Sequence, residues 1–228
     1  MDNFLDNPAW GALVSGNKNL AFGNDRVKYF DRDVSPFAAL KENSADNFKE
    51  LYEIVPHETP LLIAANKQLD IPAPWSRLRC IHGIQMICAP GPAIVTSTKL
   101  TPLTQKHVPQ MLSLTQLTNP GPFGPGTIAF GHYEGIFEGE RLAAMAGQRF
   151  HVFDHMEISA VCTHPDYTGR GYAKQLLQSQ ISRITAANGT PFLHVRRDNQ
   201  RAIAVYESLG FSTRTDIYFY VIKKNGMA

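Results

Sequence analysis

Two glycines at positions 169 and 171 stand where the chain could bind an anion. The residues before them, Met156 to Thr163, form a run typical of a β-strand, and an amphipathic helical pattern begins directly after Gly171. A glycine turn that opens a helix leaves backbone N–H groups unpaired at the positive end of the helix dipole. The amides from Gly169 to Lys174 therefore predict a phosphate site, to which the cations of Arg170 and Lys174 could add charge.

Two common phosphate-binding motifs do not fit this turn. A P-loop needs Gly-Lys-Ser/Thr after four intervening residues, and the chain has no such run. A dinucleotide fingerprint needs a glycine three positions after Gly171, where Lys174 stands instead. Considered by itself, the turn is also compatible with an ordinary helix start.

A second block farther along the chain favours a third interpretation. Thr168 to Ala173 resembles the Gln/Arg-x-x-Gly-x-Gly/Ala signature of the GNAT acetyltransferase superfamily, although Thr168 stands where the family usually has Arg or Gln. The second block matches the same family in order and spacing, at Leu193-His194-Val195, Asn199, Ala202, Tyr206 and Leu209-Gly210-Phe211. The resemblance is clearest from about Leu100 to Lys223, and within the superfamily it is closest to the glycine N-acyltransferase-like branch.

This resemblance implies an α/β (α+β) fold class, the GNAT fold, in which a mixed, mostly antiparallel central sheet is flanked by helices. It also implies acetyl-CoA as co-substrate, with its diphosphate on the turn formed by Thr168, Gly169, Arg170, Gly171, Tyr172, Ala173 and Lys174. The strand before the turn splays from its neighbour in this family, so Val161, Cys162 and Thr163 are expected to bind the pantetheine arm. Cys162 is otherwise a small buried hydrophobe, and we do not expect it to be a nucleophile. We expect one cofactor site per chain.

The incoming amine must lose a proton, because an alkylammonium has a pKa of about 10. Glu157 is the first candidate for the base, since the branch's catalytic glutamate stands eight residues before the proline of the turn, as Glu157 does before Pro165. Its uncharged surroundings predict a raised pKa. The alternative is a structural carboxylate that pairs with Arg149, and Glu134 and His194 are reserve candidates on the substrate side.

The leaving thiolate must gain a proton, and by resemblance Tyr206 donates it. A phenol and an alkyl thiol have comparable pKa values, so a neutral tyrosine suits this step. A core tyrosine is the alternative, because the neighbouring helical positions are apolar. Asn199 is expected to contact the cofactor, or else only to cap its helix.

The acceptor site is less defined by the sequence. The loop Asn119 to Thr127 is rich in proline and glycine, and Phe123 within it could cover the substrate. Its prolines forbid helix or ladder continuation, so an ordinary connection is equally compatible. His151 and His155 have metal-like spacing but no third ligand, and we expect no metal.

The predicted elements follow the order of a GNAT fold. Residues 94–100, 132–137, 141–150, 156–163, 192–195 and 217–222 are expected strands, and 107–117, 173–184 and 199–209 are expected helices. A boundary at Ala89 to Pro92 separates residues 91–228, the acetyltransferase domain, from residues 1–90. The pattern of residues 1–90 predicts an α/β structure, with strands at 19–30, 61–65 and 81–88 and a helix at 44–54. It resembles a degenerate GNAT-like half, and the alternative is an N-terminal extension with a structural role. In either case it could form the substrate-side wall.

Composition excludes several function classes. A net charge of +2 with no clustered basic face argues against a nucleic-acid binder. We expect no membrane association, since no signal peptide or spanning segment is apparent. Unpaired cysteines at 80, 88 and 162 suggest a reducing, cytoplasmic setting.

The sequence thus predicts an N-acetyltransferase that moves acetyl from acetyl-CoA to a primary amine of a small molecule or amino acid by direct attack. A non-catalytic acetyl-CoA-binding sensor or an acyltransferase with another acyl-CoA are the alternatives, and a homodimer is left open.

Overall fold

The computed structural model describes residues 3–89 and 100–225. Within them the helices are α1 (Pro8–Val14), α2 (Ala45–Ile54), α3 (Val108–Thr118), α4 (Tyr172–Ala186) and α5 (Gln200–Glu207), with a 3-10 turn η1 (Phe4–Asp6) before α1. The strands are β1 (Ala21–Gly23), β2 (Val27–Phe30), β3 (Phe37–Leu40), β4 (Leu61–Ala65), β5 (Trp75–Cys88), β6 (Thr101–Pro102), β7 (Glu134–Glu138), β8 (Arg141–Val152), β9 (His155–Thr163), β10 (Thr190–Arg196) and β11 (Phe211–Lys224).

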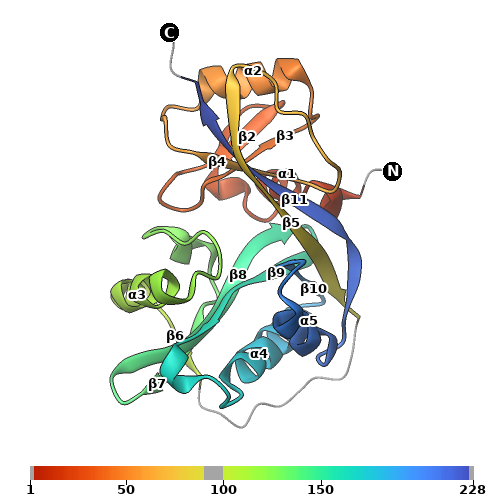
Figure 1. Ribbon diagram of the computed structural model, residues 1–228. Coiled ribbons are helices and arrows are strands. Elements are labelled where there is room, and N and C mark those ends of the chain that lie inside the picture. Colours follow the sequence, from red (N-terminus) through yellow and green to blue (C-terminus); the bar gives the residue numbers. More distant parts are fainter. Residues whose placement is uncertain (1–2, 90–99, 226–228) are drawn as a thin grey trace.

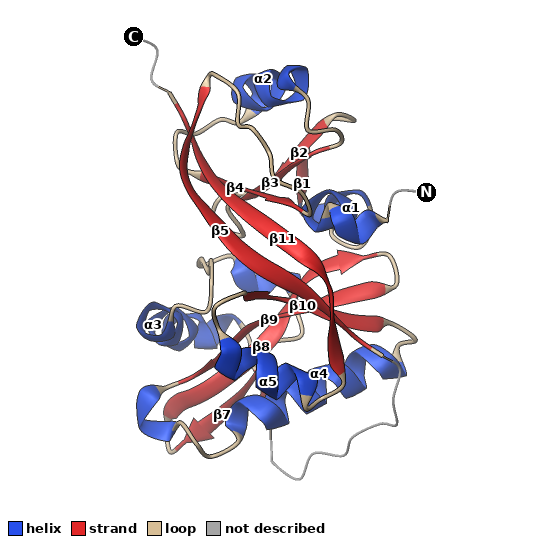
Figure 2. Cartoon of the chain, turned by 45° about the vertical axis from the view of Figure 1, so that its right-hand side comes forward, coloured by secondary structure: helices blue, strands red, loops and turns tan. Residues whose placement is uncertain are grey.

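All described strands belong to one mixed sheet. Its order is β1-β2-β3-β4-β11-β5-β10-β9-β8-β7-β6, and only the pairs β3–β4 and β9–β10 are parallel. The two long strands β5 and β11 pair along their whole length and run diagonally between the end that carries α2 and the end that carries α3 to α5 (Figure 1). Figure 2 shows the same two strands as a continuous twisted ribbon. This ribbon connects the two predicted parts of the chain.

Helices cover both faces of the sheet. Apolar residues of α1 and α3 share one buried cluster, which includes Leu13, Met111 and Phe150. Apolar residues of α4 and α5 share another, which includes Leu177 and Ile203. The faces are thus distinct, and side chains that alternate along β9 and β10 reach either the α1–α3 face or the α4–α5 face.

Strands β9 and β10 separate after a short parallel contact. They pair only from His155 to Glu157 on β9 and from Thr190 to Phe192 on β10. Beyond that point β10 continues on β5, whereas β9 continues on β8. A bulge in β9 includes Ala160 at φ +52°, a left-handed value that is uncommon for alanine. Within residues 3–89 and 100–225, the second half of β9 therefore has no strand partner on its β10 side.

Most predicted elements of the C-terminal part are confirmed. The hairpin turn at Glu138 to Glu140 joins β7 and β8, with Gly139 at φ +60°. Ser44 caps α2, since its hydroxyl accepts from the amide of Asn47. Almost all of the predicted strand at 94–100 lies outside the described residues. Helix α1 was not predicted, and β5 begins before the residues assigned to it.

Candidate active site

The glycine turn forms an open cradle at the start of α4. Gly169 and Gly171 have φ values of +81° and +76°, and Gly171 is the N-cap without a side-chain cap. A Cβ on Gly169 would meet nothing within 4 Å, so the backbone is open to a ligand. Among the described residues, no protein acceptor is recorded for the amides of 169–174. Exposed donors at a helix N-terminus suit a phosphate group.

Two buried polar atoms, one before and one after this turn in the sequence, also have no protein partner among the described residues. They are Oγ1 of Thr163, at the end of β9, and Oε1 of Gln175, in the first turn of α4. A buried hydroxyl or amide oxygen without a hydrogen bond is costly unless a ligand or water satisfies it. Both atoms could therefore form a hydrogen bond with a ligand or with water at the end of β9 and at the start of α4.

Arg170, one of the two cations of the turn, is already engaged by neighbouring side chains. Arg170 pairs with Glu138 at 3.4 Å and lies 5.0 Å from the ring centre of Tyr167. The hydroxyl of Tyr172 also donates to Glu138. Lys174 is exposed and has no recorded partner. Backbone amides, rather than cations, thus make up most of the donor set.

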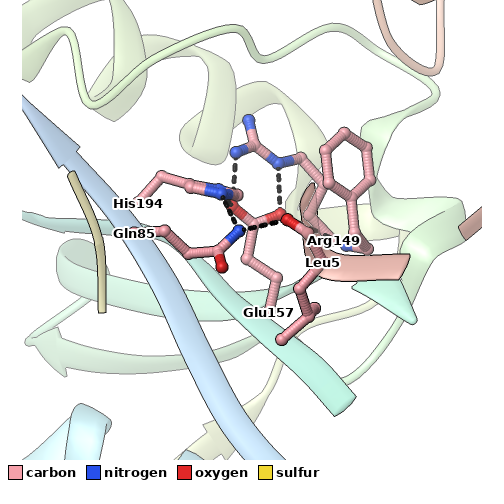
Figure 3. A network of polar contacts seen from close by, with 6 residues as sticks. Leu5, Gln85, Arg149, Glu157 and His194 are labelled. Atoms are coloured by element: carbon pink, nitrogen blue, oxygen red, sulfur yellow. Dashed lines mark hydrogen bonds and ion pairs between the residues drawn. The ribbon is translucent and has the colours of Figure 1, made fainter. Parts of the chain in front are cut away.

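On the α1–α3 face, Glu157 is the centre of a buried polar network (Figure 3). Arg149 donates to its carboxylate twice, with Nε–Oε2 at 2.8 Å and Nη2–Oε1 at 2.5 Å. Nδ1 of His194 lies 2.7 Å from Oε1, and the side chains of Glu157 and His194 are 1% and 3% exposed. The guanidinium of Arg149 in turn lies over the rings of Phe37 and Phe150. This arrangement is an enclosed carboxylate–imidazole pair.

The network keeps Glu157 ionised. Burial by itself would raise the pKa of this carboxyl, but the charges of Arg149 and His194 and the hydrogen bonds from both side chains outweigh burial and lower the pKa to about 2. The raised pKa predicted from the uncharged neighbouring sequence is therefore wrong. The sequence run gave no sign that two basic side chains from β8 and β10 meet at this carboxylate, although Arg149 was named as an alternative partner.

Tyr206 lies on the opposite face, in the cluster of α4 and α5. Its ring packs edge-on against Phe211 at 6.0 Å, and no hydrogen-bond partner of its hydroxyl is recorded among the described residues. Burial raises the pKa of Tyr206 to about 12, so the phenol keeps its proton at neutral pH. Asn199 caps α5, since its Oδ1 accepts from the amide of Ala202 at 3.2 Å.

A solved structure shows which family this arrangement belongs to. A GNAT-family protein from Novosphingobium aromaticivorans is 30% identical in sequence, and the alignment covers 98% of this chain and 100% of that one with a TM-score of 0.91. The chain belongs to the GNAT family. A GCN5-related N-acetyltransferase from Kribbella flavida shares the fold at 10% identity, with a TM-score of 0.64.

Sequence comparisons point to the same GNAT core. The family model described as FR47-like protein matches residues 133–220. The N-alpha-acetyltransferase RimI of Mycobacterium tuberculosis is 36% identical over 84 residues, which are 35% of this chain. The ribosomal protein bS18-alanine N-acetyltransferase of Salmonella typhimurium is 38% identical over 77 residues, which are 33% of this chain. Each match spans about half, 51%, of the relative. None of these relatives is a glycine N-acyltransferase, so that branch stays a prediction.

The GNAT site fits the chemistry of CoA. The free amides of the glycine turn suit its diphosphate, and the unpaired half of β9, with Thr163 Oγ1 beside it, suits the amides of the pantetheine arm. Val161 and Cys162 belong to this half of β9. Burial raises the pKa of Cys162 to about 12, which leaves a protonated thiol and agrees with a packing role.

The reserve candidates lie in different surroundings. The carboxylate of Glu134 accepts from Ser179 at 2.8 Å, Gln180 at 2.9 Å and Arg183 at 2.6 Å, all on α4. It therefore joins β7 to α4, and nothing in these contacts favours substrate binding. Phe123 packs edge-on against Tyr133 at 5.8 Å within the loop before β7. Of the reserves, only His194 is brought together with Glu157.

Sequence reasoning missed one member of the site. Gln85 on β5 is 0% exposed, and its Nε2 lies 3.0 Å from Nε2 of His194. Its position within the apolar run Ile84 to Cys88 was a usable signal, because a polar side chain in a buried strand must find partners.

No cluster of three or more His, Cys, Asp or Glu side chains is suitable for a metal ion within residues 3–89 and 100–225. His151 stacks on His132, whereas His155 pairs with Asp154. No helix in the same part of the chain is long and apolar enough to span a membrane.

Proposed function

We propose that this protein is an N-acetyltransferase that moves acetyl from acetyl-CoA to a primary amine by direct attack. The observation that carries the proposal is the combination of an open glycine turn with the separation of β9 from β10, in a chain of the GNAT family. The two sites would hold the two ends of one CoA molecule, the diphosphate and the pantetheine arm.

In the reaction, acetyl-CoA supplies a thioester. A bond forms between the amine nitrogen and the acetyl carbon, and the carbon–sulfur bond breaks. The ammonium loses two protons in all, the sulfur gains one, and one proton is released.

On the amine side, the Glu157–His194 pair removes the proton. With its pKa of about 2, Glu157 is a weak base, so it acts through His194 instead of accepting the proton itself. The ionised carboxylate orients the imidazole through Nδ1 and stabilises the imidazolium that forms, as carboxylates do beside catalytic histidines. This keeps Glu157 in the mechanism in a different role from the predicted one.

On the thiolate side, Tyr206 supplies a proton. Its phenol is neutral and lies on the other face of the sheet from Glu157 and His194. A donor and an acceptor on opposite faces suit a reaction in the gap between β9 and β10, because the amine would enter from one face and the sulfur leave toward the other.

A small acceptor is favoured by the loop before β7. The amide of Gly126 donates to the carbonyl of Asp33 at 2.8 Å, and the hydroxyl of Thr127 donates to Val34 at 2.7 Å. The loop is thus tied to the N-terminal part of the chain above the α1–α3 face. A tied loop restricts access more than a free one, which favours a small molecule or amino acid over a folded protein.

The test is an assay of thiol release and product mass with acetyl-CoA and a panel of amines, amino acids and short peptides. Release of CoA with an acetylated amine is the expected result, and the preferred acceptor class follows from the panel. Binding of acetyl-CoA without release from any amine would contradict catalysis and favour a sensor. Activity only with longer acyl-CoAs would show that acetyl-CoA is the wrong donor and that the protein is a different acyltransferase.

A further inference from the structure

A chain of polar groups continues from His194 toward the N-terminal segment, and it begins at the buried side chain of Gln85. Gln85 Nε2 donates to the carbonyl of Leu5 at 2.9 Å and lies 3.0 Å from Nε2 of His194 (Figure 3). The other end of the same amide, Oε1, accepts from Nη1 of Arg214 at 2.8 Å. Nη2 of Arg214 pairs with Asp6 at 2.6 Å. The network thus includes two residues of η1, which lies far from β10 in the sequence.

These contacts determine which way the Gln85 amide points. A guanidinium only donates hydrogen bonds, and a backbone carbonyl only accepts them. The oxygen of Gln85 must therefore face Arg214, and its NH₂ group must face Leu5 and His194. A rotated amide would place NH₂ against a guanidinium and oxygen against a carbonyl, and neither contact would be a hydrogen bond.

The orientation of the amide in turn determines the tautomer of His194. One N–H of Gln85 is used by Leu5, and the other points at Nε2 of His194, which must accept it. The ring proton then lies on Nδ1, where it is donated to the carboxylate of Glu157. Every donor in this chain meets an acceptor, so the neutral tautomer with an unprotonated Nε2 is favoured.

A β-bulge in β11 explains how Arg214 reaches Gln85. The pairing register of β11 on β5 shifts between Thr213 and Thr215, which makes Arg214 the extra residue of a β-bulge. A bulge redirects a side chain that regular alternation would place elsewhere. The carboxylate of Asp6 pairs with the other terminal nitrogen of this guanidinium, Nη2. The Arg214 side chain is 19% exposed and the Asp6 side chain is 35% exposed.

We propose that Gln85 is a positioning residue that keeps Nε2 of His194 ready to accept a proton, and that Arg214 and η1 hold Gln85 in place. This rests on the proposed function, in which His194 accepts the proton of the amine. An ammonium is a stronger hydrogen-bond donor than an amide, so the substrate replaces Gln85 at Nε2 when it arrives. The N-terminal part thereby contributes to catalysis as well as to the sheet.

The tautomer can be read without any substrate. In ¹⁵N-histidine-labelled protein, His194 is assigned by the signals lost in His194→Gln. The expected spectrum shows a protonated, pyrrole-type Nδ1 and an unprotonated, pyridine-type Nε2. A wild-type His194 with its proton on Nε2 would overturn the proposal.

Gln85→Glu tests the role of the amide. A carboxylate at position 85 accepts from Nε2 and leaves His194 between two acids, so both nitrogens should become pyrrole-type. We expect kcat to fall by about tenfold or more, with the KM for acetyl-CoA unchanged, because the accepting nitrogen is blocked. An altered tautomer with unaltered kcat would overturn the proposal and leave the proposed function intact.

Gln148→Glu is the matched control, because Gln148 is also buried, at 2% exposure, but bonds to Gln180 rather than to an imidazole. It should leave the spectrum of His194 unchanged.

If Gln85→Glu does not fold, Arg214→Gln replaces it, since loss of the guanidinium frees the Gln85 amide to rotate. A spectrum of His194 unchanged in folded Arg214→Gln would contradict the anchoring role. If His194 shows the expected tautomer but the protein acetylates no amine, the proposed function is refuted and the tautomer assignment stands.

Discussion

At the scale of single residues, Glu157 shows how a carboxylate can be both enclosed and charged. Its burial favours the neutral acid, while Arg149 favours the ion, and the result is a pKa of about 2. A buried ion pair contributes little net stability compared with an apolar pair, but removal of one partner is strongly destabilising. The pair is therefore better explained by the orientation it gives to His194 than by its contribution to folding.

The lowered pKa of Glu157 predicts acid sensitivity. The folded protein binds this proton only near pH 2, whereas the unfolded chain binds it near the ordinary value of 4.5. The stabilisation is present above pH 4.5 and is lost as the pH falls toward 2, and it amounts to on the order of 3 kcal/mol. Denaturant unfolding at several pH values should show this decline in the wild type and a weaker one in Glu157→Gln.

The matched control for acid sensitivity is Asp198→Asn. Asp198 also has a lowered pKa, caused by Arg196, but this carboxylate is exposed. Its removal should leave the decline of the unfolding free energy at low pH nearly unchanged. If the unfolding free energy falls equally with pH in the wild type and in Glu157→Gln, Glu157 is not kept ionised by its network.

Tyr206→Phe removes one hydroxyl from the α5 side of the gap. Loss of a general acid typically costs about 10²- to 10⁴-fold, so kcat should fall by at least about 10²-fold while the affinity for CoA is retained. Tyr29→Phe is the control, because Tyr29 is also partly buried but belongs to the N-terminal part. Steady-state kinetics and calorimetry measure the two quantities. Full activity in Tyr206→Phe would assign the phenol to packing.

At the scale of elements, the turn before α4 depends on backbone conformation. Gly171→Ala places a Cβ on a residue at φ +76°, where an L-residue costs about 1 kcal/mol or more. We expect calorimetry to show weaker binding of CoA but not of pantetheine, which lacks the diphosphate. Gly139→Ala, at φ +60° in the β7–β8 turn, is the strain-matched control and should leave CoA binding unchanged. Equal loss for both ligands would indicate general distortion.

Local patterns predicted the elements that carry short-range signals. The glycine turn, the helical stripe from Ala173 to Ile184 and the hairpin around Gly139 follow from neighbouring residues alone, and all three are present. Networks between strands could not be predicted in this way, because Arg149, His194 and Glu157 come from three different strands. The same holds for the bulge that redirects Arg214.

At the scale of the whole molecule, β5 and β11 connect both ends of the sheet. Because the ribbon pairs with β4 at one end and with β10 at the other, unfolding of either end exposes apolar residues of the other. We expect one cooperative transition in denaturant, with matching free energies from amide exchange in β4 and β9. Two transitions would instead support independent domains on either side of the predicted boundary near residue 90.

The position of β5 also has a consequence for synthesis. It precedes both of its partners in the sequence, yet it lies between β10 and β11 in the sheet. While the ribosome makes residues 89 to 189, this long strand exists with both edges open, and open edges invite pairing with other chains. We therefore expect the nascent chain to be prone to mispairing at β5 until β11 emerges, and a premature stop before Phe211 leaves β4 and β5 without the strand that joins them.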